Sequence, residues 1–328
     1  MPNFDAFLLV SFGGPEKHVD VIPFLENVLR GRDVPRERLL EVAEHYYHFG
    51  GGSPINQQNR ELLAALKHVL PIPVYWGNRN WHPLLAETVT QMRKDGVRRA
   101  LALATSAFGS YSGCRQYIQN IADARTAASA KLGEGAPEIV KLPPFSGHPQ
   151  FVEAMADRLR TAVSESPDAQ VVFTAHSIPE SMAATSPYVE DLKTACAKVY
   201  DSVFGNGVVI NGDANGNDWT LVYQSRSGPP TQPWLGPDVC DYIRETKRNT
   251  IVAPIGFLSD HMEVLYDLDT EARAVAEGLG VKMVRAGTVG THPAIMKMIA
   301  EMVERAQSEE PVACSANCCP APLRRPAR

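Results

Sequence analysis

The chain has 328 residues, 44% hydrophobic and 21% charged, which is typical of a globular protein long enough for two domains. Its 32 basic and 37 acidic side chains give a net charge of −5, which argues against a nucleic-acid-binding surface. No apolar run approaches the ~20 residues that span a bilayer, and no basic stretch precedes the short apolar run at the N-terminus as in a signal peptide. We therefore expect a cytoplasmic protein.

Short apolar runs bounded by turn residues alternate along the chain with longer segments of helical periodicity. The runs predict buried strands at 6–10, 74–76, 100–104, 171–174, 219–223 and 250–254. Helices are predicted at 21–29, 60–70, 84–94, 114–127, 149–164, 188–204, 262–279 and about 293–306. A segment rich in Gly, Asn and Asp predicts a surface loop at 205–217. The alternation is typical of doubly wound α/β units with parallel sheets.

Prolines and a glycine interrupt this pattern at residues 141–149, which indicates a boundary between two similar halves. We expect an N-terminal Rossmann-like half at 1–148, a C-terminal Rossmann-like half with the final helix at 149–309, and a cysteine-rich tail at 310–328. Ligands of open α/β sheets bind beyond the carboxyl ends of the strands, so the cleft between the halves is the predicted site. The sequence contains neither the dinucleotide-binding glycine motif nor the phosphate-loop motif, so nucleotide binding is not supported.

Three carboxylates follow one another along the predicted helix at 262–279. Glu263, Asp267 and Glu271 are spaced four residues apart and therefore share one helix face. Like charges at this spacing destabilise a helix by a few tenths of a kcal/mol per pair, which favours a bound cation. Carboxylate oxygens suit hydrated divalent metal ions. A solvated acidic face is the alternative interpretation.

His176 is the sharpest single candidate for chemistry. It stands just past a predicted strand, and Pro179 helps to fix the turn that follows. A neutral imidazole, with an unperturbed pKa near ~6.5, serves as a metal ligand or a proton acceptor. An ordinary turn histidine is the alternative, because the chain has nine histidines. His261 competes for the same role, or orients Glu263.

Aromatic residues gather near the same strand ends, where walls of this kind hold large flat ligands. Arg30 and Arg32, at the end of the helix at 21–29, would meet ligand carboxylates through charge-assisted hydrogen bonds. Core packing is the alternative for the aromatics and a solvated helix end for the arginines. The aromatic residues are Phe12, Tyr117, Tyr223 and Trp234.

Five ordered segments resemble the ferrochelatases. They are Ser-Phe-Gly-Gly-Pro at 11–15, Gly-Gly-Ser-Pro-Ile-Asn at 51–56, Ala-His-Ser-Ile-Pro at 175–179, Gln-Ser-Arg-Ser-Gly-Pro-Pro at 224–230 and Gly-Phe-Leu-Ser-Asp-His-Met-Glu at 256–263. The resemblance implies an enzyme that inserts Fe²⁺ into a porphyrin in haem synthesis, with release of two protons. It also implies the chelatase fold, in which the tetrapyrrole lies between the two halves. A non-catalytic porphyrin or metal carrier and the related cobalt and nickel chelatases are the alternatives.

The resemblance also implies roles for single residues. His176 and Glu263 would bind the iron or take the pyrrole protons, and their division of labour stays open. Asp267 and Glu271 would form an acidic ladder that leads the metal to the centre. Contacts with the macrocycle are implied for two further positions, Ser53 and Tyr117.

The segments at 23–27, 45–50 and 77–81 look closest to the actinobacterial-type enzymes, which mostly use coproporphyrin III. Phe12 stands where many bacterial relatives have Tyr, which removes a possible phenolate ligand and leaves an apolar wall. We therefore expect coproporphyrin III as the substrate, with protoporphyrin IX as the alternative. A peripheral membrane contact is left open, because haem products are poorly soluble.

Three of the six cysteines, Cys314, Cys318 and Cys319, crowd into the tail. A cytoplasmic protein of this size is not expected to have a disulfide scaffold, and such a group is more often a metal or cluster site. Some ferrochelatases hold a [2Fe–2S] cluster with three C-terminal cysteines and one internal one. A tail with reactive thiols is the alternative, and the adjacent pair departs from the expected spacing. Cys114 is the predicted fourth ligand, ahead of Cys196 and Cys240.

Overall fold

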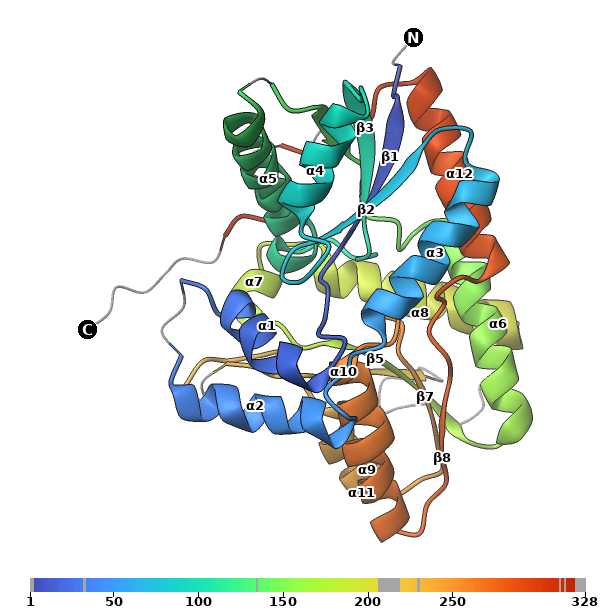
Figure 1. Cartoon of the computed structure of the whole chain (residues 1–328). Helices are drawn as coiled ribbons and strands as arrows, with labels where there is room; N and C mark the ends of the chain where they lie inside the picture. Colours follow the sequence, from blue (N-terminus) through green and yellow to red (C-terminus); the bar gives the residue numbers. More distant parts are fainter. Residues whose placement is uncertain are drawn as a thin grey trace.

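The apolar runs form two parallel sheets of four strands each (Figure 1). The first sheet has the order β2-β1-β3-β4, with β1 at Ala6–Ser11, β2 at Val74–Asn78, β3 at Arg99–Ala104 and β4 at Glu138–Lys141. The second has the order β6-β5-β7-β8, with β5 at Gln170–His176, β6 at Trp219–Gln224, β7 at Thr250–Ala253 and β8 at Met283–Arg285. Counted within its own half, each sheet has the strand order second, first, third, fourth. The two halves therefore repeat one topology.

This computed structural model describes residues 3–31, 34–133, 135–205, 219–228, 231–312, 314–315 and 317–321. Three predicted features fall wholly or partly elsewhere. Arg32, the predicted loop at 205–217 beyond Gly205, and the last two residues of the segment at 224–230 lie outside the described residues.

The first sheet is covered by helices on both faces. Successive strand residues point to opposite sides, so Leu8 and Val10 pack with α4 (Leu85–Lys94) and α5 (Gln116–Leu132). Phe7 and Leu9 point the other way and join a second core that includes α3 (Ile55–Val69). Burial on both faces explains why these strands are continuous apolar runs.

The second sheet follows the same rule. Val172, Val222 and Val252 pack beneath α9 (Val239–Thr246) and α11 (Arg273–Gly278). Phe173 and its neighbours face the opposite way, toward α6 (Pro149–Glu165) and α8 (Tyr188–Phe204). Both sheets thus have the doubly wound arrangement that the sequence predicts.

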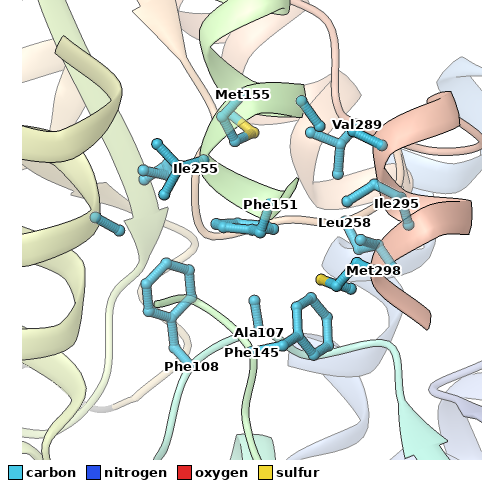
Figure 2. Packing of buried hydrophobic residues seen from close by; sticks show 14 of the residues in the cluster. Ala107, Phe108, Phe145, Phe151, Met155, Ile255, Leu258, Val289, Ile295 and Met298 are labelled. Atoms are coloured by element: carbon cyan, nitrogen blue, oxygen red, sulfur yellow. The ribbon is translucent and has the colours of Figure 1, made fainter. Parts of the chain in front are cut away.

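One hydrophobic core joins the two halves. Phe108 and Phe145 from the first half contact Phe151 of α6 edge-on, with ring centroids 6.1 and 5.8 Å apart (Figure 2). Helix α12 (Pro293–Ser308) returns from the second half to pack on α3, and Gln307 exchanges two hydrogen bonds with the backbone of Phe4. The predicted division after residue 148 falls between β4 and α6, and both halves contribute side chains to this common core. The domain boundaries stay a prediction.

Two further helices, α1 (Val21–Val28) and α2 (Arg36–His48), pack on each other around Phe24 and form a small separate core. The short helices are η1 (His18–Asp20), α7 (Glu180–Ala183) and α10 (Met262–Val264). A search of the described helices found none with the length and apolar character needed to span a bilayer. Helices α1 and α2 lie beside the second sheet and the helices that cover it (Figure 1).

The structure corrects the prediction of a single α-helix at 262–279. The chain there forms α10, then a π-helix, η3 (Leu265–Ala272), and then α11. A second π-helical segment, η2 (Tyr111–Arg115), precedes α5. π-Helical turns are rare in proteins, and those that occur are often found at functional sites. The two segments are therefore candidate parts of a functional site. Six of the described elements were not predicted at all: η1, α2, β4, α7, α9 and β8.

Candidate functional site

Buried amides hold the loop that follows β1. Asn78 donates to Asn56 Oδ1 over 3.1 Å, and Asn56 in turn donates to the carbonyl of Gly14 over 3.1 Å. Gly13 has a φ of +80°, and a Cβ there would lie 2.8 Å from Asn78 Cβ, so a side chain is excluded. Ser53 is buried against Gly14 and donates its N–H to the Pro15 carbonyl. The segments at 11–15 and 51–56 therefore form one rigid edge.

An aromatic wall rises from this edge. Phe12 is unusual among large apolar side chains because it is 37% exposed, and it meets Phe24 edge-on at 6.3 Å. Tyr117, at the start of α5, is buried. Both rings contact the guanidinium of Arg79, which lies 5.5 Å from the Phe12 centroid and 4.8 Å from the Tyr117 centroid. The structure therefore brings together two of the four predicted aromatic residues with an arginine that the sequence analysis did not single out, whereas Tyr223 packs in the core shared by the two halves.

The second half places His176 at the carboxyl end of β5. Its Nδ1 lies 2.5 Å from the Ser177 carbonyl oxygen. A carbonyl oxygen only accepts, so Nδ1 carries the proton and the neutral ring keeps its lone pair on Nε2. Nε2 lies 3.6 Å from Glu263 Oε2. The hydroxyl of Tyr188 donates to the His176 carbonyl and steadies the turn.

Glu263 lies between two imidazoles. The same Oε2 is 3.6 Å from His176 and 3.9 Å from Nδ1 of His261. Burial lowers the pKa of His261, while the charge of Glu263 opposes the shift. His261 therefore favours its neutral form beside the pair, and both readings of its role stay open.

A chain of contacts joins this pair to the aromatic wall. Burial, reinforced by the charge of Glu263, raises the pKa of Tyr46 of α2 above its ordinary range. The Tyr46 ring lies edge-on to Phe24, with centroids 5.7 Å apart, and Phe24 contacts Phe12. The chemistry-bearing residues of the second half therefore lie near the apolar wall of the first.

The predicted acidic ladder lies on the π-helix and its start. Burial raises the pKa of Asp267 to about 7, and the charges of Glu263 and Glu271 add to the shift. Ser225 donates a hydrogen bond to Asp267 Oδ2, and Gln224 Nε2 lies 3.4 Å from the same oxygen. Glu271 also has a raised pKa, caused first by burial and then by Asp238. The three carboxylates thus interact, as their spacing predicts, on a helix of a different type.

Arg285 clamps the other side of this helix. Its guanidinium contacts Asp269 over 2.8 Å and Asp260 over 3.1 Å. The backbone N–H of Asp260 also donates to Gln58 of α3 over 2.9 Å. These contacts tie the helix that carries the ladder to β8 and to the first half.

A pocket of about 420 Å³ opens between α2 and the π-helix, beside the ladder. The ring of His45 stacks on Tyr266 with centroids 3.7 Å apart. Burial lowers the pKa of His45, and Arg38 lowers it further. The lining residues are Glu44, His45, Tyr47, His48 and Tyr266.

The structure separates the last two predicted substrate contacts. Trp234 pairs with Pro179 and so lies beside the turn that carries His176, with its indole N–H buried and unpaired. Arg30 is exposed after α1 and donates to Asn27 one turn earlier. In the described part of the chain, no hydrogen bond or ion pair joins Arg30 to the His176 pair.

Of the four cysteines predicted as cluster ligands, Cys318 and Cys319 lie side by side, and Cys114 and Cys314 are near enough for their charges to act on Cys319. Cys319 is 3% exposed, and burial raises the pKa of its thiol to about 12, with additions from Cys318, Cys114 and Cys314. The sulfur atoms of Cys318 and Cys319 are 3.8 Å apart. The alternatives lie elsewhere, Cys196 in the shared core and Cys240 beneath α9 in the core of the second sheet.

Cationic side chains tie the tail to this place. Lys141 Nζ lies 3.4 Å from the sulfur of Cys114, and Arg115 donates to the backbone carbonyls of Ser315 and Cys318. Among all described residues, however, no three His, Cys, Asp or Glu side chains are arranged as a ready-made metal site.

Comparison with known proteins identifies the family. The sequence profile described as Ferrochelatase matches residues 4–307. A ferrochelatase from Rhodopirellula baltica is 49% identical, with 99% of this chain and 96% of that protein covered. A coproporphyrin III ferrochelatase from Streptomyces coelicolor is 48% identical, with 99% and 95% covered.

A solved structure supports the fold. The sirohydrochlorin chelatase SirB from Bacillus subtilis subspecies spizizenii matches with a TM-score of 0.53 at 13% identity, over 92% of this chain and 95% of that one. At this identity the match concerns the fold alone, and it confirms the predicted chelatase architecture. Since the profile and the relatives cover nearly the whole chain, the protein belongs to the ferrochelatase family.

Proposed function

We propose that this protein inserts Fe²⁺ into coproporphyrin III in haem synthesis, with His176 and Glu263 as the catalytic pair. The observation that carries the proposal is their arrangement, in which Nε2 of His176 lies 3.6 Å from a carboxylate oxygen of Glu263. A base beside an anion favours the imidazolium that forms when a proton is taken. The aromatic wall of Phe12 and Tyr117 supplies the flat surface that a porphyrin needs.

The reaction exchanges two pyrrole N–H protons for one Fe²⁺ ion. His176 accepts one proton at Nε2, where the Glu263 carboxylate stabilises the resulting charge, and the second proton passes to that carboxylate. The ladder of Asp267 and Glu271 holds the incoming metal weakly, because a carboxyl group with a pKa of about 7 is partly protonated near neutral pH. A weak ligand releases its metal to the macrocycle.

Coproporphyrin III is favoured over protoporphyrin IX by the relatives. Proteins named coproporphyrin III ferrochelatase, from Streptomyces coelicolor and Frankia alni, are each 48% identical to this chain. The Rhodopirellula relative carries no substrate in its name. The substrate therefore belongs to the proposal, while iron insertion follows from the family.

The test is anaerobic Fe²⁺ insertion by the purified protein, with coproporphyrin III and protoporphyrin IX in parallel. We expect faster turnover of coproporphyrin III, read as kcat/KM. Preference for protoporphyrin IX would contradict the substrate and leave the family activity intact. Failure with both porphyrins, combined with normal porphyrin binding, would support a carrier instead. Parallel reactions with Co²⁺ and Ni²⁺ address the related metal chelatases.

We also propose that Cys114, Cys314, Cys318 and Cys319 hold a [2Fe–2S] cluster. Support comes from the donor chemistry, because four thiolates are the usual ligands of such a cluster, the sulfur atoms of Cys318 and Cys319 lie 3.8 Å apart, and Lys141 places a positive charge beside Cys114. When bound, the cluster would supply a one-electron redox centre. Arg115 would fix the tail through its backbone carbonyls.

The cluster has a simple optical test. We expect aerobically purified protein to be brown with visible absorbance, and Cys319→Ala to lose both the colour and the acid-labile sulfide. Cys196→Ala is the matched control, because this buried thiol lies in the shared core. Colourless protein without labile sulfide would contradict the proposal.

The expected cytoplasmic location and peripheral membrane contact are proposals as well. Cell fractionation tests them together. We expect the protein in the cytosolic fraction, with any membrane-bound share released by a high-salt wash, as is typical of surface contacts.

A further inference from the structure

Arg79 lies in the loop after β2, and no described carboxylate pairs with its guanidinium. Its Nε is buried without a hydrogen-bond partner. A guanidinium carries five N–H donors and accepts nothing, and it stays protonated in proteins. A buried donor on a permanent cation therefore requires an acceptor, and the described part of the chain does not provide one.

The other arginines near the site have partners, which makes Arg79 distinctive. Arg60 pairs with Glu16, and Arg285 pairs with two aspartates. Arg30 donates to Asn27. Only position 79 combines a place on the aromatic wall with a donor that the described protein leaves unused.

The neighbours of Arg79 orient it for a ligand. Its guanidinium lies over the rings of Tyr117 and Phe12, at 4.8 and 5.5 Å from their centroids. Such stacking restricts the plane of the group and leaves its edge for hydrogen bonds. The planar edge of a guanidinium matches a carboxylate, which it binds through two parallel hydrogen bonds.

A porphyrin against this wall brings carboxylates with it. Coproporphyrin III carries one propionate on each pyrrole ring, so its whole rim is anionic, whereas protoporphyrin IX has propionates on one side only. We infer that Arg79 binds a propionate of the porphyrin and thereby favours the substrate with four carboxylates. This inference rests on the proposed function. It adds a substrate-binding residue that recognises a carboxylate, which the aromatic side chains of the wall do not.

The experiment measures binding of metal-free porphyrins by fluorescence quenching. It compares the wild type, Arg79→Gln and the control Arg98→Gln, an exposed arginine at the opposite end of β3. For Arg79→Gln we expect coproporphyrin III to bind at least about tenfold more weakly, the effect of losing one charge-assisted pair. Binding of the coproporphyrin tetramethyl ester, which has no carboxylate, should stay unchanged.

Equal losses for the acid and the ester would overturn the inference, because they would show that Arg79 only supports the wall. No loss for the acid would overturn it as well. Arg79→Lys keeps the charge without the planar edge, so we expect it to bind the acid more tightly than Arg79→Gln does, but less tightly than the wild type. A purely steric defect would not be relieved by the lysine charge. Unchanged thermal unfolding of the variants verifies that each one folds.

Failure of this inference is distinguishable from failure of the proposed function. If the wild type metallates protoporphyrin IX faster, the proposed substrate is wrong, yet the comparison of acid with ester still reports on Arg79. If coproporphyrin III is the faster substrate and Arg79→Gln binds acid and ester alike, the proposed function stands and the inference falls.

Discussion

The two halves of the molecule have the same strand order and carry different chemistry at the carboxyl ends of their strands. The first half presents neutral amides, exposed Phe12 and Arg79, whose buried Nε has no hydrogen-bond partner among the described residues. The second presents His176 and Glu263, followed by the rest of the acidic ladder. A repeated scaffold thus provides two equivalent edges, and under the proposed function their side chains make one a wall for a flat ligand and the other a site for proton and metal exchange.

The π-helical segments extend this comparison. In each half, a π-helix follows the third strand: η2 follows β3, and η3 follows β7. The first contains Cys114 of the cysteine group, and the second contains Asp267 and Glu271. At the equivalent place in both halves, a π-helical turn thus carries side chains of a type that can bind metal ions, a thiol in the first half and carboxylates in the second. The comparison predicts that changes in the second half lower kcat and that changes in the first half weaken porphyrin binding.

The largest effect is expected for His176→Ala. Removal of the base should lower kcat for iron insertion by at least about 100-fold, the usual contribution of a positioned general base. Porphyrin binding should change little, because the ring is half-exposed and contributes little packing. Steady-state kinetics and fluorescence titration separate the two quantities. His68→Ala, at an exposed position of α3, is the control, and near-normal turnover of His176→Ala would break the division between the halves.

Arg285→Met should have the next largest effect. Loss of the guanidinium leaves Asp260 and Asp269 without their partner, which should destabilise the protein by about 2 kcal/mol. Because the clamp orients the π-helix, we expect kcat to fall about tenfold while the KM for porphyrin stays constant. Urea unfolding and kinetics measure the two effects. Arg305→Met removes an exposed pair with Glu309 and should alter neither.

Much of this fold was readable because buried parallel strands leave continuous apolar runs. All six predicted strands are present, and His176 stands at the end of β5 as expected. The missed strands β4, Glu-Ile-Val-Lys, and β8, Met-Val-Arg, each have only two apolar residues, too few for a recognisable run. Helix α2 was missed because its sequence is mostly polar, with only Leu39 and Ala43 buried. Short or mostly exposed elements give a weak periodic signal.

The site was predictable only in part, because several of its determinants depend on partners far along the chain. Glu263, Asp267 and Glu271 were visible from their spacing, but the π-helix that carries Asp267 and Glu271 was not. The roles of Arg79 and Arg285 could not be predicted from neighbouring sequence. The unused donor of Arg79 and the ion pairs of Arg285 depend on residues that only the fold brings together. For Arg79 the only clue in the sequence was its place in the segment at 77–81.

A smaller effect is expected for Phe12→Ala in the first half. The ring is 37% exposed on the wall, so its removal should weaken binding of metal-free coproporphyrin III about fivefold, close to 1 kcal/mol. The comparison between halves requires kcat to stay within about twofold, since Phe12 holds no proton or metal. Val19→Ala, 69% exposed on η1, controls for loss of surface apolar area. A large fall in kcat with unchanged binding would contradict this division of roles.

The smallest effect on catalysis, and the most informative about pH, is expected for Asp267→Asn. The folded-state pKa of Asp267 is raised to about 7, so this residue favours the folded state below its unfolded pKa of 3.8 and loses that contribution as the pH rises through about 7. The asparagine variant does not titrate, so its stability relative to the wild type should increase between pH 4 and about 7 by up to a few kcal/mol.

The same titration predicts the opposite trend for catalysis. At pH 8 the wild-type carboxylate is charged and assists the metal, so the variant should insert iron about threefold more slowly at subsaturating Fe²⁺. At pH 6 the wild-type group is mostly protonated, and the two proteins should converge. Burial is the largest cause of this raised pKa, so the ionised carboxylate costs stability at neutral pH, and under the proposed function it is also a weak metal ligand. A constant rate ratio from pH 6 to pH 8 would show that Asp267 does not act on the metal through its charge.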